Sequence, residues 1–330
     1  FPRSALELIY DLEADRIRDL SFDPKVIESE RGVVASERRT SVDANNYGLL
    51  SEQLYATAFT AHPYQWPVVG WMVDIENWTI DDLKNHFKMG YSPNNATMVA
   101  VGAVKPEEII ALARKYIEPI PAHQPPPKVT TREPEQMGER RVAVNKFAQL
   151  PMLMIGYHVP ETANADYYAL QVLDTILFSG QSSRMYQRLV DKEQLALAIQ
   201  SDFGFSFDPA LFTIVAQPKE GIDPAAVEKA VYEELNKVKT AMVTDLEIEK
   251  AKNILLANFY RQMKTISGKA NQLGTYEVFF GDHRKLLTAA DDYAKVTKAD
   301  VLRVAAKYFG DKNRNVATLV PEKEPTRKPE

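Results

Sequence analysis

A repeated helix–turn–strand segment constrains the fold of this chain more than any other feature. The first copy, TIDDLKNHFKMGYSPNNATMVAVG, covers residues 79–102, and the second, TKADVLRVAAKYFGDKNRNVATLVP, covers residues 297–321. In both copies a Thr–x–x–Asp–apolar pattern predicts a capped helix, a Tyr ends it, and an Asn leads into a strand that contains Ala-Thr. A repeat about 218 residues apart indicates two related α+β domains.

The two copies are unequally complete. The second is preceded by enough chain for a whole domain, whereas the first lies close to Phe1. Measured against the second copy and usual domain lengths, roughly 90–100 residues are expected to be missing before Phe1. The chain also has no initiating Met and begins in a helical pattern, so we expect the numbering to start inside a longer protein.

Composition predicts where the domains meet. Residues 119–139 contain six prolines and few apolar side chains, which is typical of a semi-rigid linker. We predict a first domain over 1–120, a Pro-rich linker over 121–140, a second domain over 141–321 and a disordered tail over 322–330. The fold class is α+β: two homologous domains, each a mainly antiparallel sheet with helices packed on one face, the first truncated at its N-terminus.

Charge and composition exclude several classes of protein. The 330 residues are 45% apolar, carry a net charge of −5 and show no basic run, so nucleic-acid binding is not expected. No apolar stretch is long enough to span a membrane. Cysteine is absent, which excludes disulfides and thiolate metal ligands.

Two carboxylates on one predicted helix are the candidate chemical groups. Glu30 and Glu37 are seven residues apart, which nearly completes two helical turns, so they share a face with Val33 and Val34 between them. Such a pair fits either a metal ligand with a supporting acid or an ordinary solvated helix face.

The repeat distinguishes the two carboxylates. The same offset places TDLEIEKAKNILLANF, residues 244–259, over this helix. Glu30 then corresponds to about Glu249, whereas Glu37 corresponds to about Leu256. Because a face needed only for solubility would not obviously differ in this way, the asymmetry favours a function for Glu37.

Ordered motifs over nearly the whole chain resemble the pitrilysin/insulinase family of zinc peptidases (inverzincins), in the branch that includes the mitochondrial processing peptidase. They are LEADRIRDLSFDPKVIESERGVVASERR, HPYQWPVVGW and YSPNNATMVAVG, followed by GYHVP and SGQSSRMYQRLVDKEQLA. The resemblance implies a zinc-dependent endopeptidase of unfolded peptides. It also implies a clamshell of two halves that captures extended substrates, partly by strand addition to a sheet edge.

The resemblance also assigns roles to the two carboxylates. Family members bind zinc through two His of an inverted H-x-x-E-H helix and a Glu further along the chain. Glu37 matches that Glu and is the inferred zinc ligand, and Glu30 is the inferred supporting carboxylate, which we assign as catalytic. Two His and one Glu leave a fourth zinc position for water, and a nearby acid can orient a ligand or that water.

The chain departs from the family in its histidines. None of its five His lies in an H-x-x-E-H motif, which by the usual spacing is expected about 40 residues before Phe1. We therefore expect this chain alone not to hydrolyse peptides. The alternative is a non-catalytic peptide-binding or scaffold subunit of a processing-peptidase-like complex. His62, in a Pro- and aromatic-rich loop, is expected to be a packed or capping residue.

A second departure concerns partners. Many family members carry, in the second domain, an Arg and a Tyr seven residues later that bind the substrate carbonyl. Here those positions are Val190 and Leu197. The pattern favours a zinc-bearing, β-like subunit in a heterodimer with an unlike subunit that supplies Arg and Tyr, with a homodimer as the alternative. Arg184, Tyr186 and Arg188 are out of register, and we expect surface and packing roles for them.

Cellular location is predicted from composition and from the resemblance. The Cys-free composition and the likeness to bacterial members favour the bacterial periplasm, with the cytoplasm as the alternative.

Overall fold

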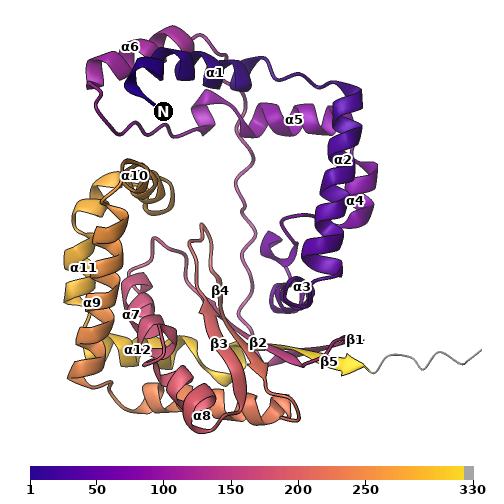
Figure 1. The fold of residues 1–330 in the computed structure, drawn as a ribbon, viewed down its shortest axis with the longest axis vertical. Helices are drawn as coiled ribbons and strands as arrows, with labels where there is room; N and C mark the ends of the chain where they lie inside the picture. Colours follow the sequence, from indigo (N-terminus) through magenta and orange to yellow (C-terminus); the bar gives the residue numbers. More distant parts are fainter. Residues whose placement is uncertain (323–330) are drawn as a thin grey trace, which may run out of the picture. The chain divides into compact units, whose positions relative to one another are not determined.

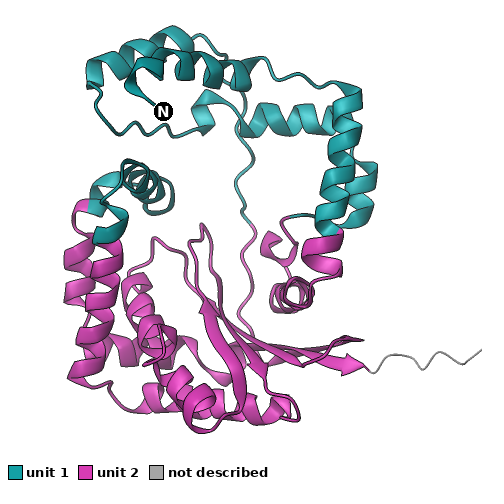
Figure 2. Cartoon of the chain, in the orientation of Figure 1, with its two compact units in different colours: residues 1–38, 69–130, 260–286 teal, residues 39–68, 131–259, 287–330 magenta. Residues whose placement is uncertain are grey.

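The computed structural model describes residues 1–322 and divides the chain into two compact units (Figure 2). Unit 1 contains residues 1–38, 69–130 and 260–286, and unit 2 contains residues 39–68, 131–259 and those from 287 onward. The predicted tail lies outside the described residues, apart from Glu322. The predicted boundaries at 120 and 141 stay a prediction.

Unit 2 is built on one mixed sheet with the strand order β1-β5-β2-β4-β3 (Figure 1). The strands are β1 (Arg140–Phe147), β2 (Met152–Val159), β3 (Ala196–Asp202), β4 (Ala210–Pro218) and β5 (Arg314–Glu322). Strands β1 and β5 pair in parallel and the other neighbours pair antiparallel, with Leu153 opposite both Thr318 and Ala216. The sheet is therefore mainly antiparallel, as predicted.

Helices make up most of the remaining described chain. Those of unit 2 are α3 (Asn46–Ala58), α7 (Tyr167–Phe178), α8 (Pro224–Thr240), α11 (Ala289–Lys295) and α12 (Lys298–Tyr308), with π-helical turns at Arg39–Asp43 and Tyr186–Lys192. Helix α9 (Asp245–Gln262) begins in unit 2 and ends in unit 1. Unit 1 contains α1 (Leu6–Arg18), α2 (Pro24–Arg38), α4 (Met72–Asn77), α5 (Ile80–Gly90), α6 (Pro106–Tyr116) and α10 (Ile266–Phe280). No helix within residues 1–322 is long and apolar enough to cross a membrane.

Side-chain alternation along β2 divides the core of unit 2 into two layers. Leu153, Ile155 and Tyr157 are buried on the face covered by α7, α8 and α12, whereas Met154 is buried on the face covered by α3. This follows from the two-residue period of a strand. Burial of each such side chain stabilises the fold by about 1.5–3 kcal/mol. Helices therefore cover both faces of this sheet, and α3 comes from the segment predicted to belong to the first domain.

Both predicted helix caps are confirmed. Thr79 precedes α5 and exchanges hydrogen bonds with Asp82, and Thr297 does the same with Asp300 before α12. The strand predicted over 96–102 is wrong, because no residue of that segment forms a strand. A strand is stable only when neighbouring strands complete its hydrogen bonds, and no described residue pairs with this segment.

The Pro-rich connection is anchored at its second half. The Glu133 carboxylate accepts hydrogen bonds from the backbone N–H groups of Thr60, Ala61 and His62, at 2.8, 2.9 and 3.0 Å. Burial raises the pKa of Glu133, but these donors outweigh it and hold the pKa at about 2. Gln136 is buried and donates to the carbonyl of Arg314. This part of the predicted linker is therefore tied to unit 2.

Candidate functional site

Helix α2 carries both predicted site residues on one uninterrupted helix. Glu30 and Glu37 are exposed, and they lie on one side of the helix with two exposed valines, Val26 and Val33. We call these four residues the outward stripe. Val34, expected on the same face, is half-buried and lies about 40° around the helix from Glu30, toward the buried side.

The neighbouring side of α2 faces α4 and is held by two arginines. Arg31 donates to the carbonyls of Ile75 and Trp78, at 2.7 and 3.0 Å, and its guanidinium lies 3.8 Å from the centre of the Trp78 ring. Arg38 is buried and donates to the carbonyl of Gly70 at 3.2 Å. These contacts, which the sequence analysis missed, attach α2 to the backbone of residues 70–78.

The backbone at the start of α3 packs tightly against the turn that follows α2. A Cβ atom on Gly48 would lie 1.9 Å from the carbonyl oxygen of Ser41, in the π-helical turn Arg39–Asp43. Only glycine therefore allows α3 to begin where it does, with the Asn45 side chain accepting from the first N–H groups of the helix.

The residues described do not form a complete zinc site. Within residues 1–322 no group of three His or acidic side chains is close enough to hold a metal ion. Glu37 can therefore offer at most one of the three zinc ligands that the resemblance implies.

The prediction for His62 is confirmed. Its side chain is buried, its Nδ1 accepts a hydrogen bond from the N–H of Tyr64, and its Nε2 lies 3.4 Å from Asp208.

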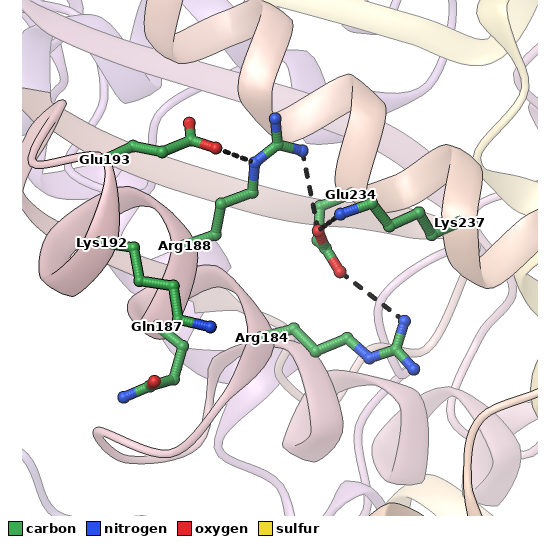
Figure 3. A pocket seen from close by; sticks show the side chains of 7 residues that line it. All are labelled: Arg184, Gln187, Arg188, Lys192, Glu193, Glu234 and Lys237. Carbon is green, nitrogen blue, oxygen red and sulfur yellow. Dashed lines mark hydrogen bonds and ion pairs between the residues drawn. The ribbon is translucent and has the colours of Figure 1, made fainter.

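The second half presents no free Arg–Tyr pair at the expected positions. Val190 packs against the core and Leu197 is exposed on β3. Both side chains are aliphatic, so neither can donate a hydrogen bond. Arg184 and Arg188 border a depression of about 370 Å³ (Figure 3). Tyr186 lies between them in the chain and begins the π-helical turn Tyr186–Lys192.

Both arginines of this depression are engaged with carboxylates. Arg184 donates to Glu247 at 2.6 and 2.9 Å, and Arg188 donates to Glu193 at 2.8 Å. Figure 3 shows both guanidinium groups directed toward the buried Glu234, at 3.6 and 3.7 Å. These ion pairs agree with the predicted packing roles.

An aromatic depression in unit 2 was not predicted. Tyr47 and Tyr55, eight residues apart on α3, face Tyr64 and Trp66 of the following loop across about 700 Å³, with Asp202 at its edge. Burial, and then the Asp202 carboxylate, raise the pKa of Tyr55 to about 12. Two features of the sequence could have indicated this surface: the Tyr-x₇-Tyr spacing and the aromatic residues of the loop that follows.

Comparison with known proteins places these features in a family. The family model described as "Peptidase M16 inactive domain" matches residues 77–255, more than half of the chain. The chain is 30% identical over 319 residues to "Zinc protease PqqE" of Helicobacter pylori, a match that covers 96% of this chain and 72% of the relative. It is 24% identical to "Probable mitochondrial-processing peptidase subunit beta, mitochondrial" of Arabidopsis thaliana, over 94% of this chain and 60% of that protein.

Solved structures show the same fold. The crystal structure of a protease from Helicobacter pylori has a TM-score of 0.92 and 30% identity, covering 97% of this chain and 77% of that one. A peptidase M16 inactive domain from Pseudomonas fluorescens has a TM-score of 0.87 at 17% identity, with coverage of 97% and 76%. At that identity the second likeness concerns the fold alone.

Proposed function

The chain belongs to the peptidase M16 family, and on that premise we propose that it is part of a zinc-dependent endopeptidase that acts on unfolded peptides. The observation that carries this proposal is the 30% identity to a protein named a zinc protease, which extends over 96% of the chain. The exposed carboxylates of α2 support it, because a metal ligand needs a side chain that other groups can reach.

Within that enzyme we assign Glu37 as one zinc ligand and Glu30 as the carboxylate that supports it. The described residues supply no set of three ligands, so we derive no catalytic step from them. We expect residues 1–330 alone to be inactive as a peptidase. A chelator-sensitive endopeptidase activity of this polypeptide by itself would contradict that expectation.

The ligand assignment is tested by Glu37→Gln in the whole protein that contains this chain. The amide is a far weaker zinc ligand than the carboxylate, so we expect the affinity for zinc to fall by about 10–100-fold or more. Peptidase activity should fall with it. The matched control is Glu76→Gln, which changes an exposed carboxylate on α4. If zinc content and activity both survive in Glu37→Gln, the assignment is wrong.

We further propose that the protein works as a heterodimer with an unlike subunit that supplies an Arg and a Tyr. Val190 and Leu197, which cannot donate hydrogen bonds, support this proposal, as does the likeness to a protein named a β subunit. Native mass measurement of the purified complex distinguishes an unlike partner from a homodimer.

For cellular location we propose the bacterial periplasm over the cytoplasm. Fractionation of the cells that make the protein tests this proposal.

The second candidate is a non-catalytic subunit that binds peptides or supports a complex. One observation favours it: the matching family model is described as an inactive domain. The aromatic depression at Tyr47 and Trp66 is a surface on which peptide side chains can pack. Peptide binding that survives complete removal of zinc, in a protein without hydrolytic activity, would favour this candidate.

A further inference from the structure

Burial of apolar side chains does not by itself set the rotation of α2 about its own axis, because apolar residues lie on two sides of this helix. Val26 and Val33 on the outward stripe are 57% and 55% exposed. The stripe that faces α4, about 100° around the helix, carries Arg31 and Arg38, and Arg38 is only 6% exposed. The same side of the helix also carries Ile27 and Val34, which are half-buried, so turning Val26 and Val33 inward would turn these two outward. A further interaction is therefore needed to select one rotation.

The contacts of the two arginines account for it. The Arg31 guanidinium bridges the carbonyls of Ile75 and Trp78 and stacks on the Trp78 ring at 3.8 Å. Arg38 repeats the arrangement two turns later, with a hydrogen bond to the Gly70 carbonyl and its guanidinium 5.3 Å from the Trp71 ring. Carbonyl oxygens at fixed positions accept these bonds in one rotation of the helix only.

We propose that Arg31 and Arg38 are positioning residues that hold α2 in the rotation that directs Glu30 and Glu37 outward. Each arginine follows one of the carboxylates by a single residue, so both pairs keep the same angle around the helix. The significance of the two carboxylates rests on the proposed function, whereas the rotation itself does not. We expect lysine to be a poor replacement, because its ammonium is a point charge on a flexible stem and lacks the planar, rigid fork with which arginine reaches separate carbonyls while it stacks on a ring.

The absence of cysteine allows a direct test, because any thiol introduced is the only one in the chain. Val33→Cys places a thiol on the exposed stripe, and Ala35→Cys places one on the buried side, where Ala35 is 8% exposed. The alkylation rate of each is measured in three backgrounds. These are the native chain, Arg31→Lys with Arg38→Lys, and Arg16→Lys as the control, since Arg16 is an exposed residue of α1 paired with Glu13.

In the native and control backgrounds we expect the thiol at position 33 to react much faster than the thiol at position 35. In the double lysine background the ratio of the two rates should fall about tenfold toward one, because α2 then samples other rotations. An unchanged ratio would overturn the proposal. Equal acceleration of both thiols would overturn it too, because it would show that the arginines stabilise α2 without setting its rotation.

The result is independent of the test of function. The thiol ratio needs neither zinc nor peptidase activity, so it decides the role of the arginines even if Glu37→Gln leaves zinc binding intact. Conversely, an unchanged ratio leaves the ligand assignment of Glu37 to be decided by its own experiment.

Discussion

The two copies of the repeat have the same helix caps and different surroundings. In unit 2, Val301, Val304 and Ala305 of α12 are fully buried against the sheet, and the following strand β5 pairs with β1 on one side and β2 on the other (Figure 1). In unit 1, α5 has no buried residue, and segment 96–102 pairs with no described strand. Local sequence is sufficient for the cap and the helix, whereas the strand depends on its neighbours.

The largest difference is expected in hydrogen exchange. The amides of β5 bond to strands on both sides, so they should exchange only when the sheet opens, whereas amides 96–102 have no ladder. We expect β5 to exchange at least about a thousandfold more slowly, measured residue by residue at neutral pH. Equal protection of the two segments would mean that 96–102 is paired in solution, and the comparison would fail.

The next difference is in the core. Val304→Asp places a carboxylate in a fully buried position and should destabilise unit 2 by about 3–5 kcal/mol in urea unfolding. Its counterpart in the first copy is His86, which is exposed, and His86→Asp should change stability by less than about 0.5 kcal/mol. A large loss in His86→Asp would show that this face of α5 is covered in solution.

The caps should respond alike in both copies. Thr297→Ala and Thr79→Ala each remove a hydroxyl that accepts from the third helical N–H, and each should cost about 1 kcal/mol in the unfolding of its own unit. The measurement is unfolding followed by probes placed separately in the two units. Clearly unequal costs would indicate that the caps, too, depend on tertiary surroundings.

The smallest effect concerns the pH dependence of the caps. Hydrogen bonds from Thr79 and Thr297 lower the pKa values of Asp82 and Asp300 below the ordinary 3.8. A lowered folded-state pKa adds stability above pH 3.8, and that stability is lost as the pH falls through the folded-state values. Carboxyl chemical shifts in an NMR titration should show both midpoints below 3.8. A midpoint at or above 3.8 for either residue would contradict its capping role.

Much of the fold was predictable because its signals are local. The two capping boxes, the presence of strands in the second domain and the packed role of His62 all follow from residues close together in sequence. The packing of α3 on the sheet could not be predicted. Leu50 and Leu54 contact Met154 across about 100 residues, and no short sequence pattern indicates such a contact.

The candidate site likewise combines features that the sequence predicted with features that it did not predict. The spacing of Glu30 and Glu37 predicted that they share a face, and both are exposed on α2. The spacing did not predict that Val33 would be exposed beside them while Arg38 is buried, because the apolar residues of this segment lie on two sides of the helix and select no single rotation.

The sequence by itself determined the helices, their caps and the shared face of the two glutamates, since these depend on a 3.6-residue period and on hydrogen bonds within four residues. Only the tertiary structure decided which strands pair and which way α2 is turned. Both outcomes depend on acceptors and donors that are distant in the chain: the neighbours of β5, and the carbonyls of residues 70–78 that hold Arg31 and Arg38.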